Sequence, residues 1–420
     1  MSARLSRLAQ GLIGSEILKI AAEVRELIAS GQPVCNLTVG DFSPSEFQVP
    51  ERLARGVADY VTKGQTNYPP SNGVLELRRA VSAFYKRGLG LDYPVESIMI
   101  TSGGRPVIYG IYQTVVNPGE RVVFPVPSWN NNHYATLVGA EQVAIPCGAD
   151  TNFLPTADLL RTHLRGATLL ALNSPSNPTG TLFTEQQLAD ICDLVLDENA
   201  RRGPNDRPLY VLYDQIYWML TFGGAKHVNP VSLRPEMAQY TIFVDGISKA
   251  FAATGLRVGW GVGPADVIKR AADLLTHIGA WAPRPEQMAT GELLCAEDDI
   301  RDYHAVMIRD IQERLTLLAD GIDQLRRDGL PVESTTPQGA IYLSARFRLH
   351  GRRAPDGTTL ATNEDIRRYL LQAAGMAIVP FQAFGQAEDN GWFRLSVGAV
   401  SPQAVRELIP RLRASLQALA

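Results

Sequence analysis

The fold class is decided by residues 241–262, which read TIFVDGISKAFAATGLRVGWGV. A short apolar run, Thr241–Val244, leads into a glycine turn with Lys249, and a second apolar run, Val258–Val262, follows. Continuous apolar runs of this length are typical of strands that are covered on both faces. Because a lysine at the end of a buried strand is costly without a partner, Lys249 is a candidate functional residue.

Five runs of the same kind precede this stretch, and each ends in a polar or glycine-rich turn before a helical segment. They are Ser97–Thr101, Arg121–Val126, Gln142–Ile145, Thr168–Leu172 and Leu209–Tyr213. Alternation of strands and helices implies a mostly parallel sheet sandwiched by helices. The seven runs therefore predict one large α/β domain with a seven-stranded sheet, which we place at residues 48–299.

After about residue 264 the order of expected helices and strands changes, and it predicts a smaller α+β domain. This part shows one long helical stretch at about 286–328, several short strands and a last helix from Pro402. The expected strands are Gly339–Ala345, Ala377–Val379 and Phe393–Val397. Residues 5–30 and 48–63 carry apolar residues at helical spacing. We expect residues 1–47 and 300–420 to form the smaller domain together.

The composition is that of an ordinary globular protein. Of 420 residues, 45% are apolar and 20% are charged, and the formal charge is −3. This balance argues against a non-specific nucleic-acid binder, which needs a basic surface. No apolar run approaches the roughly 18–20 residues of a membrane span. The N-terminus shows no signal-peptide cleavage pattern, so we expect a cytoplasmic protein that contacts neither nucleic acid nor membrane.

The four cysteines lie far apart in the sequence. They are Cys35, Cys147, Cys192 and Cys295. No pair has the spacing of a metal site, and no histidine stands at a matching distance. We therefore expect four buried, reduced thiols and no bound metal.

Polar residues with complementary chemistry follow the predicted strands, where ligands bind in open α/β sheets. Asn177 lies in the turn SPSNPTG after the fourth run, and Asp214 and Tyr217 follow the fifth. Arg257 stands near the seventh run, and residues 102–105, SGGR, open a helix after the first. Pyridoxal 5′-phosphate (PLP) requires such a set, because it needs an amine, an acid for its ring nitrogen, donors for its ring oxygen and a phosphate site.

With these residues in view, the chain resembles the class I/II aminotransferases of PLP fold type I, close to the aspartate aminotransferase group. The likeness is strongest at residues 248–260, SKAFAATGLRVGW, which is similar to the family signature SKxFxxTGxRxGW. It implies a ping-pong transfer of an amino group from an L-amino acid to a 2-oxo acid through a Schiff base on Lys249. Since this lysine must be neutral to act as a base, burial should lower its pKa. The peptide bonds before Pro127 and Pro178 match cis positions of the family.

The resemblance also implies how the cofactor is held. Asp214 corresponds to the partner of the ring nitrogen, Tyr217 and Asn177 to donors to the ring oxygen, and Trp129 to the stacked aromatic residue. The expected phosphate contacts are Gly103, Gly104, Arg105, Ser248 and Arg257, with Tyr68 reaching the phosphate of the partner subunit in a homodimer. Many members have a serine or threonine where this chain has Gly246, so one phosphate hydroxyl is expected to be missing.

For the substrate, the resemblance points first to Arg394. It matches the arginine that grips the α-carboxylate, because a guanidinium fits a carboxylate through two hydrogen bonds. Gly40 matches the small residue beside that carboxylate, and Trp129 and Asn177 are expected to contact the substrate as well.

Selection of the substrate depends on the distal pocket. One subgroup of aspartate aminotransferases reads the distal carboxylate with a lysine directly after Gly-Gly, and Arg105 stands there with the same charge. The other subgroup uses an arginine of the neighbouring subunit, for which this chain has Ile278, with Arg284 close by as a substitute. Ser15 and Glu16 are expected near the substrate mouth, where an inward-facing Glu16 would repel a dicarboxylate.

We therefore expect aspartate as the amino donor and 2-oxoglutarate as the acceptor. An aminotransferase for aromatic or other neutral amino acids stays open, since Trp129 suits both kinds of substrate. A PLP-dependent C–S β-lyase also fits the motifs, and it would release pyruvate and ammonia without an oxo-acid acceptor. A non-catalytic PLP-fold sensor is a third alternative, but such sensors carry an appended DNA-binding region that we do not expect here.

Overall fold

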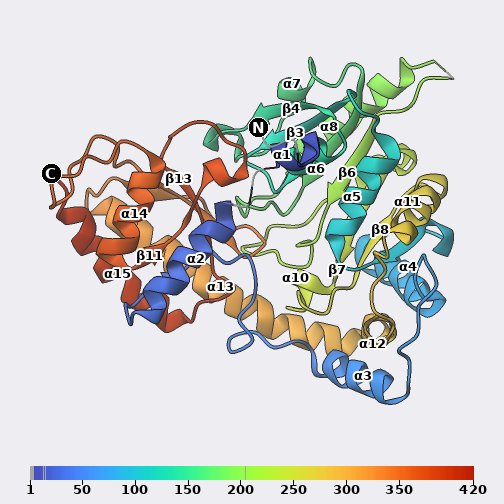
Figure 1. The fold of residues 1–420 in the computed structure, drawn as a ribbon, viewed down its shortest axis with the longest axis horizontal. Helices are drawn as coiled ribbons and strands as arrows, with labels where there is room; N and C mark the ends of the chain where they lie inside the picture. Colours follow the sequence, from blue (N-terminus) through green and yellow to red (C-terminus); the bar gives the residue numbers. More distant parts are fainter. Residues whose placement is uncertain (1–3, 13, 15, 204) are drawn as a thin grey trace.

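The computed structural model describes residues 4–12, 14, 16–203 and 205–420, with the side chains of residues 16–18 left out. Ser15 and the side chain of Glu16, expected near the substrate mouth, therefore lie outside the described part. The chain forms two lobes, and the long helix α13 (Glu297–Arg327) runs along one side of the molecule (Figure 1).

A seven-stranded sheet forms the centre of the larger lobe, in the order β2-β8-β7-β6-β5-β3-β4. Its strands are β2 (Ile98–Thr101), β3 (Arg121–Val126), β4 (Glu141–Pro146), β5 (Ala167–Asn173), β6 (Tyr210–Asp214), β7 (Thr241–Gly246) and β8 (Gly259–Val262). The strand β8 is antiparallel to both of its neighbours, and the other pairs are parallel. The predicted α/β class, the mostly parallel sheet and its seven strands are confirmed.

Helices cover both faces of this sheet. They are α3 (Glu51–Thr62), α4 (Leu75–Leu89), α5 (Gly104–Val115), α6 (Asn131–Leu137), α7 (Ala157–Leu160), α8 (Glu185–Ala200), α9 (Pro230–Leu233), α10 (Ile247–Ala250), α11 (Ala265–His277) and α12 (Arg284–Cys295). Because side chains of a strand alternate between faces, Leu170 and Leu172 of β5 join the apolar cluster under α4, α8 and α12. Leu169 and Ala171 join the cluster under α5 and α11.

The smaller lobe contains an antiparallel sheet in the order β12-β13-β10-β9 and a parallel pair, β1-β11. Its strands are β1 (Cys35–Asn36), β9 (Val332–Ser334), β10 (Tyr342–Phe347), β11 (Met376–Ala377), β12 (Val379–Pro380) and β13 (Trp392–Ser396), and its helices include α2 (Glu16–Ala29), α14 (Asn363–Ala374) and α15 (Pro402–Gln417). Pairing of β1 with β11 brings residues 35–36 of the N-terminal part of the chain beside residues 376–377 of its C-terminal part. The predicted division at 47/48 and 299/300 stays a prediction, and α13 begins three residues before 300.

Two of the predicted helices are interrupted. The stretch predicted at 286–328 is two helices, α12 and α13, which meet at Ala296, where φ is −95° and ψ is 77°. Three acidic residues follow at 297–299, and acids are favoured in the first turn of a helix because they oppose its dipole. The stretch at 5–30 is likewise α1 (Arg7–Gly11) and α2, with Gly14, a poor helix former, between them. Short 3-10 turns lie at Val95–Ser97, Ala149–Thr151, Pro235–Gln239 and Phe381–Phe384.

The cysteines agree with the prediction except at one position. All four are free thiols, and Cys35, Cys147 and Cys192 are buried. The expectation of a buried thiol is wrong for Cys295, which is exposed at the last residue of α12. The break at Ala296 leaves this helix end at the surface.

Candidate active site

A cavity of about 650 Å³ opens between the carboxyl ends of the large sheet and the smaller lobe. Both lobes and the N-terminal segment line it, so residues far apart in the sequence meet there. The predicted site residues in its wall are Gly40, Gly104, Arg105, Trp129, Asn177, Asp214, Tyr217, Ser248, Lys249, Arg257 and Arg394.

Lys249 lies on α10, directly after β7, and its Nζ donates a 2.7 Å hydrogen bond to the carbonyl of Gly40. Burial lowers the pKa of Lys249 to about 8, against the opposing effect of the Asp41 carboxylate. Three cations lower this pKa further: Arg394, Arg105 and Arg257. The amine is therefore deprotonated far more readily than an ordinary lysine.

Asp214 ends the central strand β6 and faces the cavity. Its Oδ1 accepts a 3.1 Å hydrogen bond from the backbone N–H of Ile216. Burial raises the pKa of Asp214 to about 6, while that hydrogen bond and the charge of Lys249 oppose the rise. In the described part of the chain, Asp214 forms no ion pair, so its carboxylate is available to a cationic group in the cavity.

Arg394 lies on β13 with only 1% of its surface exposed. Its Nη2 donates to the carbonyl of Thr38 at 2.6 Å, and its Nη1 donates to Oδ1 of Asn177 at 3.3 Å. Among the described residues its Nε has no hydrogen-bond partner, and no carboxylate touches the guanidinium. Because a buried, unpaired cation is costly, this arrangement favours binding of an anion.

Tyr342 of β10 belongs to the site, although the sequence did not mark it. Its hydroxyl lies 2.7 Å from the hydroxyl of Tyr217, and its ring lies 4.8 Å from the Arg394 guanidinium carbon. A Cβ at Gly40 would stand 2.9 Å from the Tyr342 hydroxyl, which explains the glycine there. Tyr342 is the first residue of β10 and stands between Ile341 and Leu343, so no adjacent polar residue singles it out in the sequence.

Residues 102–104 and Arg257 form a tight cradle at the N-terminus of α5. Arg257 donates to the carbonyls of Thr254 at 2.7 Å and Ser102 at 2.9 Å. A Cβ at Gly103, where φ is +87°, would collide with the Arg257 guanidinium. The free N–H groups at this helix start and the fixed guanidinium suit a phosphate.

The structure also explains Gly246, where the resemblance led us to expect a missing hydroxyl. A Cβ at this position would lie 2.7 Å from the carbonyl of Val258 and 2.8 Å from Cα of Gly259. The neighbouring strand β8 therefore leaves no room for a side chain. Ser248, two residues later, is buried and lines the cavity.

Comparison with known proteins gives the family. The family model for aminotransferase class I and II matches residues 32–412. The chain belongs to this family. A protein of Rhizobium leguminosarum bv. phaseoli named as a probable aspartate/prephenate aminotransferase is 31% identical over 410 residues, which cover 95% of each chain.

Solved structures show the same relationship for this aminotransferase. The aspartate aminotransferase of Rhizobium meliloti superposes with a TM-score of 0.90, at 26% identity and with both chains covered completely. An aromatic aminotransferase of Pyrococcus horikoshii OT3 gives a TM-score of 0.81 at 26% identity, covering 94% of this chain and 98% of that chain. Since enzymes named for acidic and for aromatic substrates share this fold, the fold does not choose the substrate.

The enzyme is a PLP-dependent aminotransferase, and the described site fits that cofactor. The cradle of Gly103 and Arg257 suits the phosphate, the unpaired carboxylate of Asp214 suits a protonated ring nitrogen, and Lys249 offers an amine of lowered pKa. The bonds before Pro127 and Pro178 are cis, as predicted, and so is the bond before Pro175.

Two predicted site residues, Gly103 and Tyr68, are not part of the cavity wall; Gly103 lies behind it in the cradle with Arg257, and Tyr68 lies at the surface. The Tyr68 side chain is 81% exposed, and its ring packs edge-on against Trp281 at 5.4 Å. Arg284 donates a 3.1 Å hydrogen bond to Asn67, next to Tyr68. Ile278 is also exposed. The expected reach of Tyr68 into a partner subunit stays a prediction.

Proposed function

We propose that this aminotransferase transfers the amino group of L-aspartate to 2-oxoglutarate in a ping-pong reaction. The observation that carries this proposal is the meeting of Lys249, Asp214 and Arg394 in one cavity. Arg394 is buried, Lys249 and Asp214 are partly buried, and none of the three has a direct ionic partner in the described chain. The exposed cation Arg105 in the wall of the same cavity favours an acidic substrate. The names of the relatives support aspartate as the first choice.

In this proposal each residue does one part of the work. Arg394 holds the substrate α-carboxylate, with Asn177 fixing one of its Nη groups. The neutral Nζ of Lys249 takes the proton from the substrate Cα and later delivers a proton. When bound, PLP supplies an electron sink for the charge that develops at this carbon.

Other residues would hold the cofactor. Asp214 pairs with its ring nitrogen, and Tyr217 and Asn177 donate toward its ring oxygen. Trp129 stacks on the ring. The phosphate is held by Gly103, Gly104, Ser248 and Arg257, and Arg105, which the resemblance also allowed as a phosphate contact, is assigned to the distal carboxylate of the substrate. These assignments rest on the family pattern, and the Gly103–Arg257 cradle and the unpaired carboxylate of Asp214 support them.

A homodimer with a shared active site is part of the same proposal. The exposed aromatic ring of Tyr68 and the exposed Ile278 would be covered by a second copy of the chain.

A cytoplasmic location is also proposed, because the four free cysteines suit a reducing compartment. Within the described residues, no helix combines the length and the apolar character that a membrane crossing needs.

The half-reaction with single amino acids tests the substrate. The purified holoenzyme is mixed with one L-amino acid at a time, and the change of cofactor absorbance is followed. We expect aspartate and glutamate to convert the cofactor faster than alanine or phenylalanine. Conversion by phenylalanine alone would make the enzyme an aromatic aminotransferase, and steady release of pyruvate and ammonia without an oxo acid would make it a β-lyase.

A further inference from the structure

The charges in the cavity wall are not balanced. Its cations are Arg25, Arg105, Lys249, Arg257 and Arg394, and its acids are Asp41 and Asp214. In the proposed function Lys249 takes part in the chemistry, Arg257 holds the phosphate and Arg394 holds the α-carboxylate. Arg25 has no role, and Arg105 is the cation that the sequence already suggested for a distal carboxylate.

Arg25 lies in the second half of α2. Ala21 and Arg25 both line the cavity, and four residues of separation place them on one face of the helix. The Arg25 side chain is exposed. In the described part of the chain it forms no hydrogen bond and no ion pair, so its guanidinium is available to a ligand.

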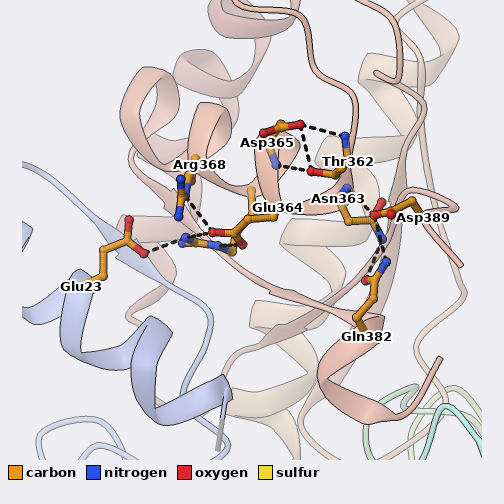
Figure 2. Close-up of polar contacts among 9 residues, drawn as sticks. Glu23, Thr362, Asn363, Glu364, Asp365, Arg368, Gln382 and Asp389 are labelled. Atoms are coloured by element: carbon orange, nitrogen blue, oxygen red, sulfur yellow. Dashed lines mark hydrogen bonds and ion pairs between the residues drawn. The ribbon is translucent and has the colours of Figure 1, made fainter. Parts of the chain in front are cut away.

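An adjacent flank of α2, about 100° away around the helix axis, is packed against the smaller lobe. Ile20 and Val24 are buried in an apolar cluster with Phe381 and Trp392. In Figure 2 the side chain of Glu23 on α2 lies across from Glu364 on α14. The Arg367 guanidinium joins the two, and its Nη2 donates a 2.7 Å hydrogen bond to Glu23.

This contact also fixes the rotation of α2. Arg367 is only 2% exposed and also binds Glu364 through two hydrogen bonds of 2.7 Å. Since residues two apart on a helix are about 200° apart around its axis, fixing Glu23 on the lobe turns Arg25 toward the cavity.

We propose that Arg25 is a specificity-determining residue that binds the distal carboxylate of a dicarboxylic substrate together with Arg105. This inference rests on the proposed function, because it assumes an acidic substrate. Arg394 already takes the α-carboxylate at the buried end of the cavity, so a second carboxylate extends toward the exposed side. There two guanidinium groups from different helices can each donate paired hydrogen bonds to it.

The test compares Arg25→Gln with Glu26→Gln, a matched control on the next residue of α2 that is exposed and does not line the cavity. For each holoenzyme, kcat/KM is measured with L-aspartate and with L-alanine. The dissociation constant of succinate, a dicarboxylate without an amino group, is measured by calorimetry. We expect Arg25→Gln to lower the aspartate:alanine ratio about fivefold and to weaken succinate binding by a similar factor, the effect of a partly exposed ion pair.

Three results would overturn the inference. They are an unchanged aspartate:alanine ratio in Arg25→Gln, an equal loss with both substrates, and the same change of ratio in Glu26→Gln. In each case the wild-type enzyme still converts aspartate, so the proposed function stands. If wild-type holoenzyme converts alanine but neither aspartate nor glutamate, the proposed function itself fails, and the inference falls with it before any variant is compared.

Discussion

The inner floor of the cavity and its exposed mouth are built in different ways. The floor consists of Asp214, Lys249 and Arg394. Lys249 and Arg394 donate to the backbone carbonyls of the distant residues Gly40 and Thr38, and Asp214 accepts from the backbone N–H of Ile216, two residues along the chain. The mouth consists of Arg25 and Arg105, which are both exposed. The guanidinium carbon of Arg105 lies 5.1 Å from the centre of the Trp129 ring. A floor fixed by hydrogen bonds suits chemistry that is the same for every amino acid, whereas exposed side chains at the mouth can adapt to the substrate.

The largest effect is expected from loss of the floor amine. Lys249→Ala should lower the rate of transamination roughly 10⁴-fold, because it removes the general base and the site of covalent cofactor attachment. Steady-state rates with aspartate and alanine measure the loss. Lys226→Ala, at an exposed position outside the cavity, is the control and should keep normal rates. Covalent cofactor attachment in Lys249→Ala would refute the assignment of this lysine.

Loss of the floor arginine should be the next largest effect. Arg394→Gln removes the buried cation that binds the substrate α-carboxylate. Loss of one partner of a buried charge pair costs about 2–5 kcal/mol of binding free energy. We expect kcat/KM to fall roughly 10²-fold or more with every amino acid. A loss confined to aspartate would show instead that Arg394 belongs functionally to the mouth.

The lowered pKa of Lys249 predicts how the rate of covalent PLP attachment depends on pH. In apoenzyme mixed with PLP, covalent incorporation needs the neutral amine, so its rate should rise with pH to a midpoint near 8 and then level off. One pH unit below the midpoint, the rate should be about tenfold lower than at the high-pH plateau. Asp41→Asn should move the midpoint down, because the Asp41 carboxylate raises this pKa. A midpoint near the ordinary 10.5 of lysine would contradict the burial of the amine.

The smallest effect is expected from the fastening of α2. Glu23→Gln weakens the ion pair with Arg367. The Glu23 side chain in this pair is 41% exposed. The aspartate:alanine ratio of kcat/KM should then fall about twofold, as expected for a partly exposed pair. A ratio equal to that of the wild type, measured in the same assay, would mean that this contact does not orient Arg25.

The same contrast explains what could be predicted from the sequence. The strands and the floor residues Asp214 and Lys249 were found because continuous apolar runs mark buried strands and a charge at their ends is conspicuous. Tyr342 was missed because the residues next to it in the sequence, Ile341 and Leu343, are apolar. Arg25 was missed because a charged residue on an amphipathic helix normally faces solvent, and only the packing of α2 turns it to the cavity.

The break at Ala296 and the exposure of Cys295 were missed for a related reason. Apolar spacing continues across both helices, so the period alone predicts one helix. The acids at 297–299 were the available signal of a second helix start.

The most direct test of the account compares the aspartate:alanine ratio of single-turnover rates in three holoenzymes: wild type, Arg394→Gln and Arg25→Gln. The account predicts that Arg394→Gln lowers both rates strongly and keeps the ratio within about twofold, while Arg25→Gln lowers the ratio about fivefold. A ratio that changes more in Arg394→Gln than in Arg25→Gln would contradict the division between a common floor and a selective mouth.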